Sequence, residues 1–168
     1  MTPWRRTRQT TRAFLPLAII ALALGLVAFP AIGLHAATTE RVVTDRYSGL
    51  AISGFDPVSY FVDQKPVEGR PEYEYTYGGT VWRFRNEGNR NAFADNPSVY
   101  APLFGGYDPV GIARGVSRPG HPEVFLVLRG RLLLFYGEAA REQFLADPVT
   151  VLTDAQSHWP QVRAGLTP

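Results

Sequence analysis

The sequence of 168 residues contains no cysteine. The chain therefore cannot form a disulfide, attack a substrate through a thiolate, or accept a lipid at a bacterial lipobox. A zinc or copper site built on sulfur is excluded for the same reason. Any metal or catalytic chemistry must come from oxygen and nitrogen side chains.

Runs of one charge are also missing. The net charge is +2, but the basic residues Arg5, Arg6, Arg8 and Arg12 all precede the first acidic residue. Without them, 13 basic residues face 15 acidic ones, so the rest of the chain is slightly acidic. Such a domain offers no basic patch for a phosphate backbone, and we expect no nucleic-acid partner.

The start of the chain has the layout of an export segment. Arginines precede an apolar run over residues 13–34, and small residues then offer a cleavage point after Ala36. This pattern predicts a signal peptide over residues 1–36, by the general secretory or the twin-arginine route. An uncleaved N-terminal anchor is the alternative, since the run is long enough to span a bilayer. Either outcome predicts a periplasmic or secreted domain, with membrane contact only through an uncleaved segment.

Two β-hairpins are predicted in the remainder. Residues 37–50 are polar and aperiodic and indicate a short linker or a loosely attached first strand. Residues 72–77 and 80–84 alternate in character around two glycines, which is typical of a hairpin. Residues 124–128 and 132–136 form a second pair, and their almost continuous apolar character predicts strands buried on both faces.

Short helices are predicted after each hairpin. Asn86 is a good N-cap for a helix over residues 87–94, with Phe93 as its anchor. A helix over residues 138–146 follows the second hairpin, and another over residues 148–158 comes after it. Hairpins interleaved with helices predict an α+β fold: a small antiparallel sheet built from two hairpins, with short helices packed on it. No linker divides residues 51–168, which we expect to form one domain.

One short pattern occurs twice. Residues 54–58 and 106–110 both read Gly-aromatic-Asp-Pro-Val. Because Asp bonds the backbone of a tight turn and Pro fixes φ, we expect the same turn at both places. A duplication is the alternative, although the flanking sequences do not match.

Several segments in order carry a family resemblance. They are residues 51–61, 82–84, 89–90, 93, 97–107, 130–132 and 159–160. In these segments the chain resembles a small exported member of the YHS-domain family. The resemblance implies a small module of uncertain role, often suspected of metal binding and found beside metal-handling domains. Many members have Cys directly after the Gly-Gly-Tyr segment, where this chain has Asp108, so a soft-metal role does not transfer.

A ligand site is expected where residues 100–108 meet residues 54–60. Its candidate contacts are Asp56, Tyr60, Arg90, Tyr100, Tyr107 and Asp108. Arg90 would hold an anionic ligand, or alternatively would pair with Asp56 or Asp95 and cap the core. The metal and any other cofactor stay open: Asp56 and Asp108 could hold a hard cation if their turns met.

Signals for catalysis are weak. His121 and His158 stand alone, and each is expected to be solvated or structural. The sequence has no Gly-x-Ser-x-Gly elbow and no phosphate-binding loop. We therefore expect a non-enzymatic binding or accessory module of the bacterial periplasm, with a possible link to metal handling. The alternative is a structural or protein-interaction domain without a small ligand, whose protein partner is unknown.

Overall fold

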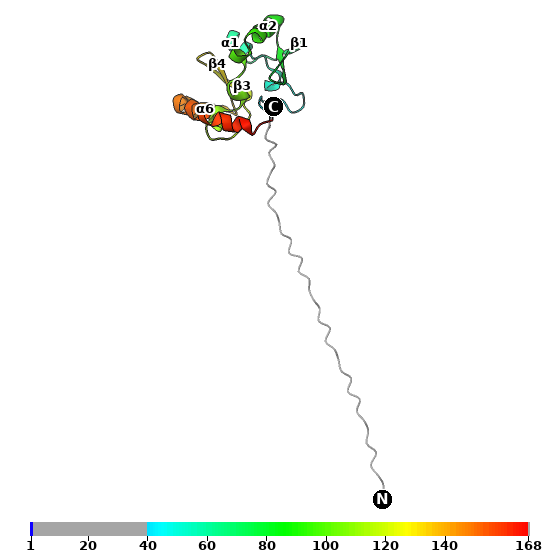
Figure 1. Ribbon diagram of the computed structural model, residues 1–168, viewed down its shortest axis with the longest axis vertical. Coiled ribbons are helices and arrows are strands. Elements are labelled where there is room, and N and C mark those ends of the chain that lie inside the picture. Colours follow the sequence, from blue (N-terminus) through cyan, green and yellow to red (C-terminus); the bar gives the residue numbers. More distant parts are fainter. Residues whose placement is uncertain (2–39, 168) are drawn as a thin grey trace. The chain divides into compact units, whose positions relative to one another are not determined.

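The computed structural model describes residue 1 and residues 40–167 (Figure 1). The predicted signal peptide and the first part of the predicted linker lie outside the described residues. Within those residues, none of the helices combines the length and apolar character that crossing a membrane requires.

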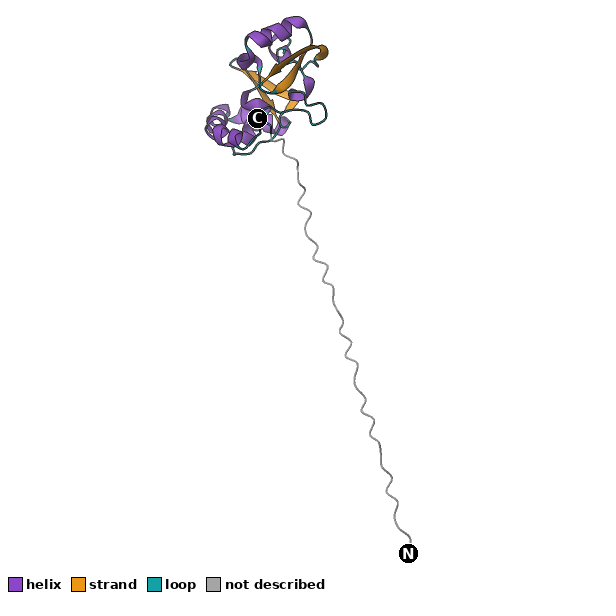
Figure 2. Ribbon diagram, turned by 45° about the vertical axis from the view of Figure 1, so that its right-hand side comes forward, coloured by secondary structure: helices purple, strands orange, loops and turns teal. Residues whose placement is uncertain are grey.

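The strands form two antiparallel hairpins (Figure 2). Strand β1 (Arg70–Tyr77) pairs with β2 (Thr80–Phe84), and β3 (His121–Leu128) pairs with β4 (Arg131–Phe135). The helices are α1 (Ser59–Val62), α2 (Glu87–Asp95), α3 (Pro97–Tyr100), α4 (Pro109–Ile112), α5 (Glu138–Ala146) and α6 (Pro148–Ala164), with 3₁₀ turns η1 (Ile52–Gly54) and η2 (Leu103–Gly106). The predicted α+β class is confirmed, with each hairpin forming its own two-stranded sheet.

Helix α6 is longer than the sequence predicts. It runs through Pro160, although proline cannot donate a backbone hydrogen bond inside a helix. Packing offsets this loss: the Trp159 ring lies 5.7 Å from the Phe104 ring, and Val162 packs on the same core. Tertiary contacts therefore extend the helix past the residue expected to end it.

Two successive parts of the chain have the same order of elements. We call residues 52–100 the first copy and residues 103–164 the second copy. Each has a 3₁₀ turn, a short helix, a hairpin, a nine-residue helix and a helix that begins at proline. Adding 51 to a residue number in β1, β2 or α2 gives the bounds of β3, β4 or α5. Both hairpins also carry a register shift at the same place.

Backbone bonds repeat as well. The N–H of Gly69 donates to the carbonyl of Gly54 at 2.9 Å, and that of Gly120 donates to the carbonyl of Gly106 at 3.0 Å. Each 3₁₀ turn has three consecutive residues at positive φ, ending in Gly54 (78°) and Gly106 (89°). The recurring tight turns expected from the sequence are therefore part of a larger repeat, which supports the duplication that the sequence comparison disfavours.

The second hairpin lies between two clusters of buried side chains. In β4, Leu132 and Leu134 pack in the first cluster, with the buried aromatic residues of β2 and α2. Leu133 and Phe135 point the other way and pack with α4, α5 and α6. All four side chains are at most 1% exposed. The predicted burial on both faces is confirmed for β4, whereas residues 124–128 of β3 are only half-buried. Each copy depends on β4 for its core.

Candidate functional site

The carboxylate of Asp56 is saturated with internal hydrogen bonds. Its Oδ1 accepts the N–H of Val58 at 2.8 Å. Its Oδ2 accepts the N–H of Arg85 at 3.0 Å and the side-chain amide of Asn89 at 2.6 Å. The Arg85 guanidinium closes the same region from outside through an ion pair with Asp63 at 2.8 Å. Asp56, 0% exposed, therefore joins η1, β2 and α2 and serves the fold.

Asp108 occupies the equivalent position in the second copy with fewer and longer bonds. Its Oδ1 accepts the N–H of Val110 at 3.2 Å, and its Oδ2 accepts the N–H of Gly111 at 3.3 Å. Burial raises the pKa of this carboxyl, more than the two N–H groups and the nearby charges of Arg118 and Arg114 lower it. The side chain caps α4 and is only 1% exposed.

A hollow of about 440 Å³ borders Asp108. We call it the Asp108 hollow; Asp108, Arg114, Arg118, Tyr136, Ala140 and Gln143 are among its lining residues. The residues beside this hollow explain why Asp108 accepts fewer and longer hydrogen bonds than Asp56 does. By the same offset of 51, Ala140 stands where the first copy has Asn89, and Tyr136 stands where it has Arg85. The second copy thus lacks the amide that bonds the aspartate in the first copy, and it has a tyrosine in place of the arginine whose guanidinium pairs with Asp63.

The two buried tyrosines hold other parts of the chain. The hydroxyl of Tyr60 donates to the carbonyl of Pro122 at 3.0 Å, and its ring meets Phe125 edge-on at 4.9 Å. Burial, with the negative charges of Asp56 and Glu123, raises the pKa of the Tyr60 phenol above its ordinary value. The hydroxyl of Tyr107 donates to the carbonyl of Glu40 at 2.6 Å. Each tyrosine therefore connects distant segments.

Arg90 and Tyr100 lie apart from the two aspartates. The Arg90 guanidinium pairs with Glu87 at 3.2 Å and with the side chain of Asn91 at 3.0 Å, all on α2. It therefore makes neither the ligand site expected beside Asp56 nor the expected pair with Asp56 or Asp95. The Tyr100 ring packs edge-on against Phe61 at 5.3 Å. Of the six predicted residues, only Asp108 lines a hollow described here.

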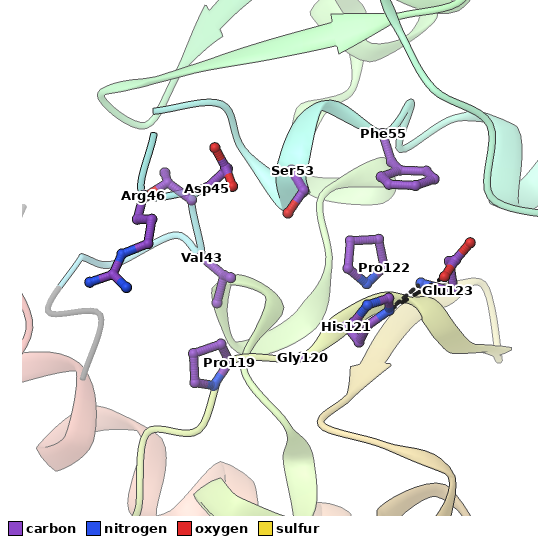
Figure 3. Close-up of a pocket in the computed structure, with 11 residues that line it drawn as sticks. Val43, Asp45, Arg46, Ser53, Phe55, Pro119, Gly120, His121, Pro122 and Glu123 are labelled. Carbon is purple, nitrogen blue, oxygen red and sulfur yellow. Dashed lines mark hydrogen bonds and ion pairs between the residues drawn. The ribbon is translucent and has the colours of Figure 1, made fainter. Parts of the chain in front are cut away.

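A second hollow lies beside the expected meeting place of residues 54–60 and 100–108. It measures about 550 Å³, and Figure 3 shows Ser53 and Phe55 on one side of it and Pro122 and His121 on the other. His121 is half exposed and accepts the N–H of Glu123 through Nδ1 at 3.2 Å. The solvated state expected for His121 agrees with this position.

A known protein family matches most of the first copy. The family model described as YHS domain matches residues 58–103. The chain contains a YHS domain. The match begins at the turn before α1 and ends in η2, so it covers most of the first copy and stops before Asp108. No curated protein and no solved structure matches the chain.

The YHS domain is loosely linked to metal handling, and a metal centre needs several donor side chains that converge on one ion. Among the described residues, no three His, Asp or Glu side chains gather at a distance suited to one ion. Asp56 and Asp108, the expected hard-cation pair, each accept backbone N–H groups within their own copy. The described residues therefore do not fit a resident metal centre.

The residues that distinguish the Asp108 hollow were missed from the sequence. Arg114, Arg118, Tyr136 and Ala140 belong to no motif of their own. A signal does exist at an offset of 51, where Phe84, Glu87, Arg90, Phe93 and Pro97 recur as Phe135, Glu138, Arg141, Phe144 and Pro148. The two Gly-aromatic-Asp-Pro-Val segments are offset by 52, and this difference of one residue hides the repeat.

Proposed function

We propose that this YHS-domain protein is an exported, non-enzymatic module that binds a small ligand in the Asp108 hollow. The observation that carries the proposal is the contrast between two equivalent buried carboxylates. Asp56 is saturated by Asn89 and Arg85, whereas Asp108 borders an open hollow of about 440 Å³. A buried carboxylate with spare acceptor capacity beside open space is suited to bind a ligand group.

Binding rather than catalysis is supported by how the other polar groups are used. The hydroxyls of Tyr60 and Tyr107 donate to backbone carbonyls, and the carboxylate of Asp56 holds β2 and α2 together. Through these hydrogen bonds, the three side chains stabilise the fold. Turnover would need a reactive group aligned with a base or an acid.

Ligand binding can be tested with the mature chain, residues 37–168. Native mass spectrometry and thermal-shift screening against a chemically mixed library of small molecules should yield at least one ligand. Ala140→Asn should abolish its binding, because the new amide repeats Asn89 and fills the space beside Asp108. Arg129→Gln, in the exposed β3–β4 turn, is the control. Binding that survives Ala140→Asn, or a library without a ligand, would contradict the proposal.

Export rests on the arginine-led apolar segment before residue 37. Expression of the full chain in a Gram-negative host should place the domain in the periplasmic fraction. Mass spectrometry of that product should give a chain beginning at Ala37. A full-length product in the cytoplasmic fraction would exclude export, and a full-length product in the membrane fraction would show that the segment remains as an anchor.

A protein-interaction role is the second candidate, and one surface favours it. Val62 is 60% exposed and Val99 is 43% exposed, and they flank the ring pair of Phe61 and Tyr100 in the first copy. Adjacent exposed apolar side chains are typical of an interaction surface. Under this alternative, Val62→Ser with Val99→Ser would abolish a specific complex in the periplasm, while Ala140→Asn would leave it intact.

A further inference from the structure

The first copy shows what the buried aspartate of this fold binds when the space beside it is filled. The side-chain amide of Asn89 donates to Oδ2 of Asp56 at 2.6 Å, the shortest hydrogen bond of that carboxylate. A nitrogen donor is therefore the natural occupant of this position. In the second copy Ala140 provides none, and Oδ2 of Asp108 has one long bond, at 3.3 Å to the N–H of Gly111.

The exposed and the buried lining residues of the Asp108 hollow carry opposite charges. Arg114 and Arg118 line it, and both are exposed. The guanidinium of Arg118 lies over the Tyr136 ring, 4.7 Å from the centroid, which holds the arginine beside the opening. Glu138 also lines the hollow, but its carboxylate is paired with Arg141 at 2.8 Å. A buried negative charge thus faces an outer pair of positive charges.

We propose that the Asp108 hollow binds a free α-amino acid, with the ligand ammonium on Asp108 and the ligand carboxylate on Arg114 and Arg118. This inference rests on the proposed function, because it names the ligand class of the same hollow. The ammonium replaces the Asn89 amide of the first copy and adds a charge-assisted hydrogen bond. The carboxylate takes the guanidinium groups, which bind carboxylates well.

Other ligand classes match this charge pattern less well. A simple anion would face the buried carboxylate of Asp108. A metal ion would find one carboxylate and two arginines, whereas hard cations take several oxygen ligands. A zwitterion whose ammonium and carboxylate groups are attached to the same carbon satisfies both ends of the hollow. The side chain of the ligand would then contact the apolar wall, which includes Val110, Val116 and Ala139.

Matched ligands make this testable. Calorimetric titration of the mature chain with the proteinogenic amino acids should reveal binding, with L-leucine as the first probe because the wall is apolar. N-acetyl-L-leucine lacks the ammonium and L-leucinamide lacks the carboxylate. Each should bind about ten-fold to hundred-fold more weakly than L-leucine, as expected for the loss of one charged hydrogen bond.

Variants locate the site. Ala140→Asn should abolish binding of the amino acid, and Arg118→Gln should weaken it about ten-fold and reduce the preference for L-leucine over L-leucinamide, since Arg114 remains. Arg129→Gln should bind as the original chain does. Circular dichroism melting of each variant establishes that it is folded.

The outcomes separate this inference from the proposed function. If no amino acid binds, but the mixed library yields another ligand that Ala140→Asn excludes, the ligand class is wrong and the binding function stands. If an amino acid binds equally well to Ala140→Asn, the site is wrong. If neither the amino acids nor the library yields a ligand, both proposals fail.

Discussion

Asp56 and Asp108 lie in the same Gly-aromatic-Asp-Pro-Val pattern but have different neighbours in space. Both precede Pro-Val and both accept the N–H two residues later, at 2.8 Å and 3.2 Å. What differs comes from α2 and α5, where Asn89 in one copy corresponds to Ala140 in the other. A single side chain about 30 residues further along the chain thus separates a structural carboxylate from a candidate binding carboxylate.

The raised pKa of Asp108 predicts a pH-dependent stability. A carboxyl whose pKa is raised by folding stabilises the protein below the unfolded pKa, and this contribution is lost as pH rises through the folded pKa. Asp108→Asn removes the ionisation but keeps an oxygen that can cap α4. The free energy of unfolding of the variant, relative to the original chain, should therefore rise as the pH increases above about 4, the ordinary pKa of an aspartate.

Urea denaturation of both proteins at several pH values measures this difference. Each unit by which folding raises the pKa of Asp108 corresponds to about 1.4 kcal/mol. The variant loses one acceptor to the N–H of Gly111, which shifts its stability at every pH alike and leaves the pH trend readable. Parallel curves over the whole range would contradict the burial of an ionised carboxylate at this position.

The two hairpins, as elements, repeat a close contact that only glycine permits. A Cβ on Gly69 would lie 2.4 Å from the Cβ of Arg83, and one on Gly120 would lie 2.6 Å from the Cβ of Leu134. Arg83 and Leu134 are themselves 51 residues apart, so the contact is the same in both copies. Each glycine lets the start of the first strand of its hairpin approach the second strand.

Gly69→Ala and Gly120→Ala should both destabilise the protein. The nearest atoms include backbone atoms of residues 83–84 and 134, which cannot move aside as a flexible side chain can. We expect a loss of about 1–3 kcal/mol for each, as for other overpacked sites. Chemical denaturation measures the loss.

Gly137→Ala is the matched control for these two substitutions. Gly137 has an extended φ of −177° and no atom near its added Cβ, and it is the N-cap of α5. Alanine is a poorer N-cap than glycine, so we expect the protein to lose less than about 1 kcal/mol. A loss at Gly137 equal to that at Gly69 and Gly120 would show that the close contact is not the cause.

Local patterns predicted the elements well and their arrangement less well. The hairpin turns at Gly78-Gly79 and Arg129-Gly130 and the cap at Asn86 are encoded by neighbouring residues, and all three are found. The continuation of α6 through Pro160 depends on the packing of Trp159 against Phe104, a contact between distant residues. Local preference could not reveal it.

The candidate site was predicted in part for a similar reason. Asp108 was identified because its turn has a recognisable pattern. The same turn pattern indicates Asp56, and the family-like segments indicate Tyr60 and Tyr107. The hydrogen-bond partners of these three side chains come from distant segments and show a structural use. Residue type and spacing indicate which groups are available, whereas packing decides which of them face open space.

At the scale of the whole molecule, side chains of the second copy pack in the core of the first. The segment before the copies, residues 40–50, contacts both of them. Leu132 and Leu134 of the second copy lie in the first cluster, so neither copy has a complete core alone. Val43 is 5% exposed and packs in the other cluster, and its N–H donates to the carbonyl of Gly105 at 2.8 Å. Residues 40–50 are thus attached to both copies.

Removal of residues 37–50 should therefore destabilise the domain strongly. Val43 is 5% exposed and Leu50 is 8% exposed, and burial of two such side chains contributes about 3–6 kcal/mol. The backbone bonds of Val43 to Gly105 and Ile52, and the bond from Tyr107 to the carbonyl of Glu40, would be lost as well. The loss is comparable to the total stability of an ordinary domain, about 5–15 kcal/mol.

Thermal and urea unfolding of residues 51–168 beside residues 37–168 measures this contribution. We expect the shorter chain to be unfolded or to melt far below the longer one. If both unfold at the same midpoint, residues 37–50 are a linker, as their polar and aperiodic sequence indicates. If the longer chain is the more stable, residues 40–50 belong to the folded domain, and cleavage after Ala36 would leave all of them in the mature chain.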